Sequence, residues 1–307
     1  MRALVATGTP AAPLEMRSVD EPALEANQAL VNVRAISINR GELRLLAARP
    51  AGWRPGQDIA GVVAQTAADG SGPPVGTRVV ALVDQAGWAE QVAVPSSRLS
   101  SLPDAVSFAQ AAALPVAGLT ALRALRLGGL LLGRTVLVTG ATGGVGHFAV
   151  QLAASAGAHV VGISRNPERG KSVLAGGDVR IESDLSTLPE RFDVILESVG
   201  GDSLTTALRL VARDGIVVMF GNSSGQEARV AFGSIMSAPH ARLYAFFIYE
   251  SGEPPTFGAD LSVLATEIAA GRLHPQIGHE ASWRDPLAAL EAVRQRSLEG
   301  KAVLRVD

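Results

Sequence analysis

The chain of 307 residues contains no cysteine, which excludes disulfide bonds, thiolate nucleophiles and cysteine-ligated zinc. It also lacks an apolar run approaching the roughly 20 residues needed to cross a bilayer. Its first residues, MRALVATG, do not show the charged-then-apolar pattern of a secretory signal. The net charge is -2 with no long basic run, which argues against a nucleic-acid-binding protein. We therefore expect a cytoplasmic protein that acts on small molecules, with no nucleic-acid or membrane partner.

The chain is long enough for two domains, and its two parts differ in pattern. With 47% hydrophobic residues it can bury a large core. Up to about residue 103, short strand candidates alternate with turn residues, at 3–5, 29–35, 59–64, 78–83 and 89–94. A helical segment at 107–127 follows, and Pro115 and Gly118 predict a break inside it.

From residue 133 onward, strand and helix candidates alternate. The strands are expected at 136–139, 159–163, 192–196, 216–220 and 243–248, with a last strand at 302–306. Helical patterns fall at 203–212, 260–271 and 285–296. This alternation predicts a parallel sheet covered by helices on both faces.

The stretch 134–157 has the order of strand, glycine turn and helix that a dinucleotide site requires. Ala141, Gly143 and Gly146 hold the three places of the G-x-G-x-x-G fingerprint, which lets a pyrophosphate rest on free N–H groups at the start of a helix. A glycine-rich loop that binds nothing is the alternative. The predicted cofactor-binding residues here are Ala141, Thr142, Gly143, Gly144, Val145 and Gly146.

The end of the second strand of this part predicts which nicotinamide cofactor binds. An acidic residue there accepts a hydrogen bond from the ribose 2′-hydroxyl of NAD, whereas an arginine accommodates the 2′-phosphate of NADP. The strand is followed by Ser164 and Arg165, with Arg169 shortly after, and no carboxylate stands at its end. Ser164 can donate its hydroxyl, and both arginines can contact phosphate. These residues favour NADPH, and a solvated basic turn is the alternative.

The glycine turn also fits T-G-x-x-x-G-x-G, the phosphate loop of short-chain dehydrogenases. The chemistry of that family needs a tyrosine followed four residues later by a lysine. Here Tyr244 is followed at that spacing by Ile248, and Tyr249 by Glu253. The catalytic pair of that family is therefore absent.

Segments spread along nearly the whole chain carry a more extensive resemblance. They are Ser37-Ile38-Asn39, PGQDIAGVV from Pro55, VGTRVVAL, GWAEQVAVP, LPDAVSFAQAAALPVAGLTAL, the glycine turn, FDVILESVGG, GIVVMFGNSSG and the closing GKAVLRV. No single string is decisive, but their order and spacing together are specific. They resemble the medium-chain dehydrogenase/reductase superfamily, in its zinc-free quinone oxidoreductase branch.

The resemblance implies an α/β protein built from a GroES-like β-barrel domain and a Rossmann domain with a doubly wound parallel sheet. The first domain would comprise residues 1–114 and be completed by 249–307. The Rossmann domain would comprise 115–248, with strand order 3-2-1-4-5-6. The active site would lie between the two domains. Edge strands of two Rossmann sheets would join in a homodimer.

Several positions match residues that the family places at its active site. Asn39 matches the active-site asparagine, and Thr120 matches the threonine near the nicotinamide. Three further segments match loops that line the nicotinamide half of the cofactor: Val199 and Gly200; Phe220, Gly221 and Asn222; and Phe246, Phe247 and Ile248. A structural turn residue is the alternative for Asn39, and ordinary strand ends are the alternative for the loops.

Two departures from the family shape the expected chemistry. The zinc-dependent branch carries cysteine ligands and a Gly-His-Glu segment where this chain has Gly56-Gln57-Asp58, so we expect no metal. Many quinone reductases carry a tyrosine soon after the asparagine, where this chain reads NRGELR. The protein would therefore hold a nicotinamide against an acceptor that is already electrophilic. The proton would come from water, from the cofactor ribose, or not from the enzyme.

The sequence thus predicts a zinc-independent, NADPH-dependent oxidoreductase that transfers hydride to a quinone or an α,β-unsaturated carbonyl. The aromatic residues around Phe247 indicate an apolar or aromatic carbonyl substrate, with ordinary core aromatics as the alternative. Two other functions stay open. One is an enoyl-thioester reductase acting with a carrier protein, and the other is a non-catalytic NADPH-binding sensor.

Overall fold

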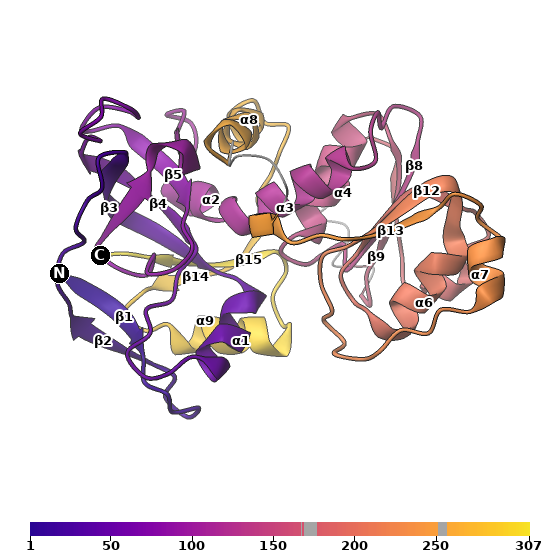
Figure 1. Cartoon of the computed structure of the whole chain (residues 1–307), viewed down its shortest axis with the longest axis horizontal. Helices are drawn as coiled ribbons and strands as arrows, with labels where there is room; N and C mark the ends of the chain where they lie inside the picture. Colours follow the sequence, from indigo (N-terminus) through magenta and orange to yellow (C-terminus); the bar gives the residue numbers. More distant parts are fainter. Residues whose placement is uncertain (167, 169–176, 251–256) are drawn as a thin grey trace. The chain divides into compact units, whose positions relative to one another are not determined.

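The computed structural model describes residues 1–166, 168, 177–250 and 257–307, and the chain divides into two compact units (Figure 1). Unit 1 comprises Met1–Leu119, Glu253–Gly271 and Pro275–Asp307, and unit 2 comprises Thr120–Gly252 and Arg272–His274. The chain first passes from one unit to the other inside helix α3 (Pro115–Arg126). Within the described residues, no helix has the length and apolar character of a membrane span.

Unit 1 is built on a seven-stranded sheet of order β14-β15-β3-β4-β5-β7, in which β6 also pairs with β3. The strands of unit 1 are β1 (Arg2–Ala6), β2 (Leu14–Ser18), β3 (Gln28–Ile38), β4 (Asp58–Gln65), β5 (Arg78–Leu82), β6 (Gln91–Pro95), β7 (Leu99–Ser101), β14 (Ile277–Ser282) and β15 (Lys301–Arg305). Its other helices are α1 (Arg40–Ala48), α2 (Phe108–Ala112), α8 (Phe257–Ala269) and α9 (Leu287–Gln295). Because β15 pairs antiparallel with β3, the C-terminal segment completes the N-terminal sheet.

The core of unit 1 follows from the alternation of apolar residues along its strands. In β3, Ala29, Val31 and Val33 are buried while the residues between them are partly exposed. Two tryptophans, Trp88 and Trp283, are almost fully buried in the same core. The strand ends are held by this packing, so polar groups placed there have fixed positions.

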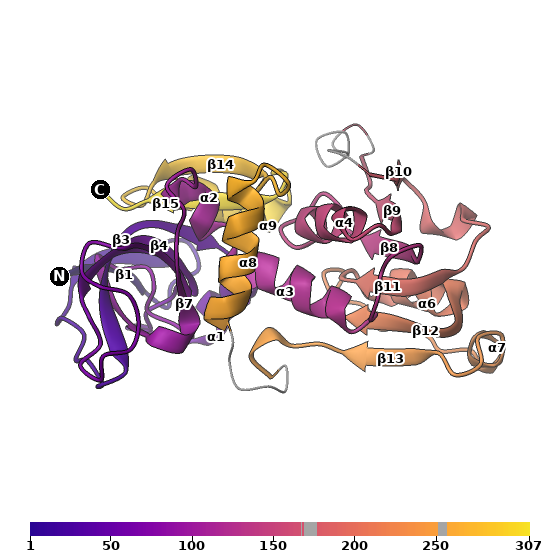
Figure 2. The same cartoon turned by 90° about the horizontal axis from the view of Figure 1, so that it is seen from above.

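Unit 2 is a parallel sheet of order β10-β9-β8-β11-β12-β13, which in chain order is the predicted 3-2-1-4-5-6. The strands are β8 (Thr135–Thr139), β9 (His159–Ile163), β10 (Val179–Glu182), β11 (Phe192–Glu197), β12 (Val211–Met219) and β13 (Arg242–Ala245). Helix α4 (Gly146–Ser155) covers one face, and α6 (Gly201–Leu210) covers the other, where α7 (Phe232–Met236) contacts it (Figures 1 and 2). The central strand β8 is buried on both faces, which explains its unbroken apolar run.

Several predicted element boundaries are wrong. The helical segment 107–127 breaks at 113–114, while Pro115 begins α3 because proline is accepted at the first helical position. Gly118 lies inside α3, where an added Cβ would come within 3.0 Å of Leu264, so the glycine permits close packing with α8. The helix predicted at 203–212 ends at Leu210, and the strand predicted at 243–248 ends at Ala245.

Helix α1 and the strands β2, β7, β10 and β14 were not among the expected elements. These elements are short or lack a clear periodic pattern of apolar residues. Helix α1 nevertheless carries a sequence signal for its start. Asn39 and Glu42 have the spacing of a capping box, and the Asn39 N–H donates to Glu42 Oε2 at 2.7 Å. That pairing predicts a helix beginning at Arg40.

Candidate functional site

The glycine turn joins β8 to α4 in a geometry that only glycine allows at two positions. Gly140 has a φ of +66°, in the left-handed region. A Cβ added to Gly146 would lie 2.1 Å from the Gly140 carbonyl oxygen and 2.8 Å from the Ala141 Cα. The first turn of α4 therefore packs directly on the end of β8, as the third glycine of the fingerprint requires.

The start of α4 offers backbone donors. The Gly143 N–H closes the turn onto the Gly140 carbonyl, and the His147 N–H donates to the Gly143 carbonyl. In contrast, Gly144, Val145 and Gly146 donate to no acceptor within the described residues, and no side chain caps the helix. These free N–H groups lie at the positive end of the helix dipole, which is the arrangement that binds a phosphate.

The end of β9 lies beside this turn. Ser164 is buried, and its Oγ lies 3.3 Å from Thr142 Oγ1 and donates to the Asn166 carbonyl at 2.9 Å. Arg165 is exposed and forms no ion pair with the described residues. Arg169 lies outside the described residues. The structure thus brings Ser164 and the glycine turn together, and no carboxylate of the described chain pairs with the Arg165 guanidinium.

A buried carboxylate, Glu197, ties the end of β8 to the loop after β11. Its Oε1 accepts hydrogen bonds from Thr139 Oγ1 at 3.1 Å, the Val199 N–H at 3.1 Å and Ser203 Oγ at 2.8 Å. Its Oε2 accepts from the Gly200 N–H at 2.9 Å. The sequence interpretation missed this residue. An acidic residue that ends an apolar strand three residues before a glycine pair is the signal that could have found it.

The loop after β12 is docked on the loop after β11. The Ser223 N–H donates to the Ser198 carbonyl, and the Ser224 N–H donates to the Val199 carbonyl. Gly200 has a φ of +76°, and an added Cβ would lie 2.3 Å from Asn222 Oδ1. The predicted residues Val199, Gly200, Phe220, Gly221 and Asn222 therefore lie in one pair of adjoining loops at the carboxyl ends of β11 and β12, where ligands bind in open parallel sheets.

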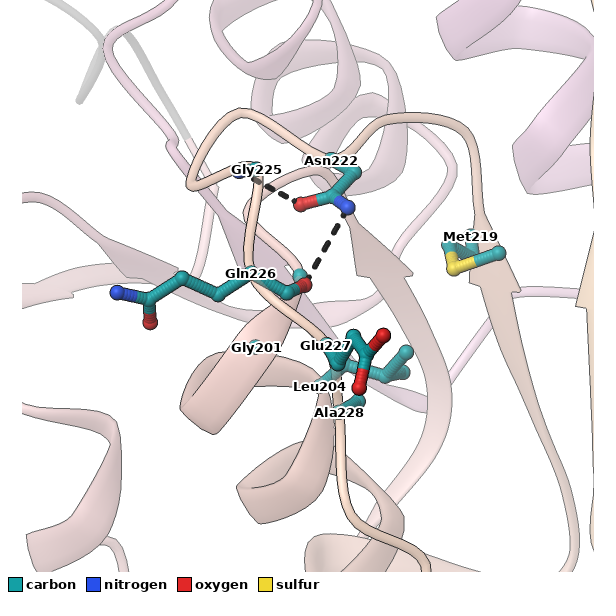
Figure 3. Close-up of a pocket in the computed structure, with 9 residues that line it drawn as sticks. Gly201, Leu204, Met219, Asn222, Gly225, Gln226, Glu227 and Ala228 are labelled. Atoms are coloured by element: carbon teal, nitrogen blue, oxygen red, sulfur yellow. Dashed lines mark hydrogen bonds between the residues drawn. The ribbon is translucent and has the colours of Figure 1, made fainter.

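A cavity of about 390 Å³ opens against these loops (Figure 3). Asn222 shapes its rim, because its Oδ1 accepts from the Gly225 N–H and its Nδ2 donates to the Gln226 carbonyl. The lining residues are Gly200, Gly201, Leu204, Met219, Asn222, Gly225, Gln226, Glu227 and Ala228.

The remaining predicted cofactor residues of unit 2 differ in exposure. Thr120 is buried in α3, and Phe246 and Ile248 are buried after β13. Phe247 is 59% exposed, and its ring centroid lies 5.4 Å from that of Tyr249. Phe247 therefore keeps an aromatic surface that the fold of unit 2 does not cover.

Asn39 lies in unit 1, in a buried polar cluster at the end of β3. Its Nδ2 donates to Asp58 Oδ2 at 2.8 Å, and its Oδ1 accepts from Lys301 Nζ at 2.5 Å. Asp58 Oδ2 also accepts from Ser37 Oγ and Lys301 Nζ, and Asp58 Oδ1 accepts from the Val116 N–H. The sequence interpretation did not single out Lys301 or assign Asp58 a role.

Glu42 is the least satisfied member of this cluster. Burial, followed by the charge of Asp58, raises the pKa of its carboxyl group to about 8, while the Asn39 N–H and the Lys301 charge act in the opposite direction. Its Oε1 has no hydrogen-bond partner within the described residues. Burial therefore favours the protonated form of the Glu42 carboxyl group.

Across the residues that the structure describes, no group of three or more histidine, aspartate or glutamate side chains could hold a metal ion. Cysteine is absent from the sequence altogether.

Comparison with known proteins places this architecture in a family. The model for the alcohol dehydrogenase GroES-like domain matches residues 25–104, and the model for the zinc-binding dehydrogenase matches residues 144–265. The chain belongs to the medium-chain dehydrogenase/reductase superfamily. Within that superfamily it belongs to the quinone oxidoreductase-like branch. The predicted fold class, a GroES-like domain plus a parallel-sheet Rossmann domain, is confirmed.

Three relatives illustrate this placement within the superfamily. The chain is 28% identical over 312 residues to quinone oxidoreductase-like protein 2 of Bos taurus, covering 95% of this chain and 89% of that protein. It is 34% identical over 293 residues to the spectinabilin polyketide synthase system protein NorB of Streptomyces orinoci, covering 92% of this chain and 13% of that protein. The solved structure of Escherichia coli quinone oxidoreductase complexed with NADPH has a TM-score of 0.88 at 23% identity, with 100% of both chains covered, and this likeness shows the fold.

Proposed function

We propose that the protein is a zinc-independent, NADPH-dependent oxidoreductase that transfers hydride to a quinone or an α,β-unsaturated carbonyl. The observation that carries the proposal is the glycine turn, where three N–H groups at the start of α4 donate to no acceptor in the described chain. In this proposal they hold the pyrophosphate of the cofactor. Ser164 and Arg165, at the end of β9, receive the 2′-phosphate. The relative from Escherichia coli was solved with NADPH, which agrees with this choice.

When bound, the dihydronicotinamide supplies a hydride. The loops ordered by Glu197, with Thr120 and the segment from Phe246 to Ile248, would position the nicotinamide ring. Asn39 would contact the acceptor. Quinones and conjugated carbonyls suit a site without zinc, because addition of hydride gives a delocalised oxyanion or enolate that needs only a few hydrogen-bond donors. Within this proposal the substrate is an apolar or aromatic carbonyl compound, and the location is the cytoplasm.

A homodimer belongs to the same proposal. Strand β13 pairs with β12 on one side and with no strand on the other within the described sheet (Figure 2). Its apolar residues Leu243 and Tyr244 are 50% and 42% exposed. Pairing of two such edges would cover them and satisfy their free backbone groups. Light scattering should give twice the chain mass of 31.6 kDa, whereas a monomer would contradict this part of the proposal.

An enoyl-thioester reductase is the second candidate, because the chain aligns along 92% of its length with one part of a polyketide synthase system protein. A non-catalytic NADPH sensor is the third. The three candidates differ in turnover. An enoyl-thioester reductase consumes NADPH with a thioester-linked enoyl group, and a sensor binds NADPH without consuming it.

The test is consumption of NADPH, with NADH in parallel, against ortho-quinones, para-quinones, conjugated enones and an enoyl thioester. Turnover of quinones or enones with a strong preference for NADPH is the expected result. The matched control is Gly146→Ala, whose added methyl group would collide with the Gly140 carbonyl and block the phosphate site. Turnover confined to the enoyl thioester, or tight NADPH binding with no turnover, would refute the leading proposal.

A further inference from the structure

The two strands on either side of β3 bring opposite charges to its end. Ser37 of β3 is paired with Asp58 at the start of β4, and Ile38 is paired with Ala302, the residue after Lys301, on β15. Lys301 Nζ and Asp58 Oδ2 are 3.2 Å apart, and the side chains are only 3% and 0% exposed. Asn39, at the end of β3, lies against both of them.

Every hydrogen of the Lys301 ammonium group has an acceptor. These are Asn39 Oδ1 at 2.5 Å, Asp58 Oδ2 at 3.2 Å and the Ile38 carbonyl at 3.4 Å. Removing two charges from water costs several kcal/mol per ion, and a well-packed apolar pair is often at least as stable. The notable effect of this pair is therefore the geometry that it imposes on its neighbours rather than a gain in stability.

That geometry fixes which way the Asn39 carboxamide faces. Its oxygen faces the Lys301 ammonium group and its nitrogen faces the Asp58 carboxylate. Rotating the amide by 180° would place two donors, the amide nitrogen and the ammonium group, against each other, and two acceptors, the amide oxygen and the carboxylate, against each other. In the observed orientation, one Nδ2 hydrogen is bonded to Asp58. The other hydrogen has no acceptor within the described residues. The ammonium group also polarises the amide, which makes this remaining N–H a stronger donor.

We infer that Lys301, together with Asp58, is a positioning residue that holds the Asn39 carboxamide as a hydrogen-bond donor for the oxygen of the acceptor. The inference rests on the proposed function. As hydride adds to the ring or β-carbon of the acceptor, the electron pair displaced through the conjugated system collects on the carbonyl oxygen. The free Nδ2 hydrogen stabilises this oxyanion until it takes a proton from water. Lys301 contacts neither the cofactor nor the acceptor in this scheme and acts through Asn39.

The test is a double-mutant cycle measured with NADPH and the best acceptor of the panel. Asn39→Ala and Lys301→Met should each lower kcat by about 10- to 100-fold, somewhat less than the loss of a complete oxyanion-hole donor. If Lys301 acts through Asn39, adding Lys301→Met to Asn39→Ala should lower kcat by less than about 2-fold. The KM for NADPH should stay within about 2-fold in all three, because the glycine turn is in unit 2.

Controls separate this role from a purely structural one. Arg305 lies on the same strand as Lys301, and Arg305→Met removes its exposed ion pair with Glu280 of β14, which should leave kcat unchanged. The single variant Lys301→Met leaves the Asp58 carboxylate buried without its cation, which could destabilise the fold. The double variant Lys301→Met/Asp58→Asn removes both charges, so the cluster keeps no unpaired charge. That double variant should fold, as judged by its circular dichroism spectrum and thermal midpoint, yet keep the low kcat.

The amide hydrogens of Asn39 give a readout that does not depend on turnover. In the wild-type protein, the two Nδ2 hydrogens of Asn39 should give separate proton resonances, with the one bonded to Asp58 shifted downfield. The separation should shrink in Lys301→Met, where the carboxamide loses the cation that orients its oxygen. Coincident resonances in the wild type, independent losses in the cycle, or an unchanged kcat in a folded Lys301→Met variant would overturn the inference alone. A wild-type protein that reduces no acceptor would instead refute the proposed function, and with it the catalytic part of this inference.

Discussion

Glu42 should make the stability of unit 1 depend on pH. The side chain is fully buried, and burial together with the charge of Asp58 raises its pKa from 4.5 to about 8. The carboxyl group therefore keeps its proton in the folded protein at pH values where the unfolded chain has lost it. The substitution Glu42→Gln removes this titration and keeps an oxygen that can accept a hydrogen bond from the Asn39 N–H.

The sign and size of the effect follow from proton linkage. When the folded-state pKa is the higher one, the stabilisation is fully present below the unfolded-state pKa and is lost as the pH rises through the folded-state pKa. The slope is about 1.4 kcal/mol per pH unit, and the interval from 4.5 to about 8 spans roughly 3.5 units. Relative to Glu42→Gln, the wild-type free energy of unfolding should fall by about 5 kcal/mol across the whole interval, and by roughly half of that between pH 5.5 and 7.5.

Urea unfolding followed by tryptophan fluorescence measures this effect. The chain has three tryptophans, Trp53, Trp88 and Trp283, and all of them lie in unit 1, so the signal reports that unit alone. Glu280→Gln, which removes an exposed carboxylate in the same unit, is the control for the loss of one acidic group. Parallel stability curves for the wild type and Glu42→Gln between pH 5.5 and 7.5 would refute the argument, because they would mean that Glu42 is ionised inside the fold.

Three further predictions concern unit 2. Gly146→Ala should abolish NADPH binding in calorimetry, since its Cβ would lie 2.1 Å from a carbonyl oxygen, whereas Gly233→Ala, with open space around its Cβ, should bind normally. Arg165→Ala should weaken NADPH binding by about 1.5–3 kcal/mol, the typical contribution of a hydrogen bond to a charged group, and leave the affinity for NADH unchanged. Equal losses for both cofactors would count against the 2′-phosphate assignment. In Glu197→Gln the new side chain cannot accept all four hydrogen bonds, so the free energy of unfolding of unit 2 should fall by about 3 kcal/mol. Urea unfolding followed by circular dichroism measures this change, and an unchanged midpoint would contradict a loop-ordering role for the carboxylate.

Much of unit 2 could be predicted from the sequence because its signals are local. The apolar run of β8, the glycines of the turn and the apolar positions of α4 are adjacent in the chain, and their spacing follows from backbone geometry. The strand order of the sheet was predicted by resemblance to the family. The boundaries were less certain, since Val211 continues a helical pattern but is drawn into β12 by pairing with Phe192 of β11.

The polar cluster around Asn39 shows where sequence reasoning ends. The sequence by itself determined the fold class, the glycine turn and the candidate role of Asn39, because each depends on residues close together or on segments in a fixed order. Only the tertiary structure decided that Lys301, more than 260 positions away, lies against Asn39, because antiparallel pairing of β15 with β3 sets that contact. Burial, which raises the pKa of Glu42, is likewise a property of packing that no local pattern encodes. The local signal at Glu197 marks the residue, but only the folded chain shows which loop groups donate to it.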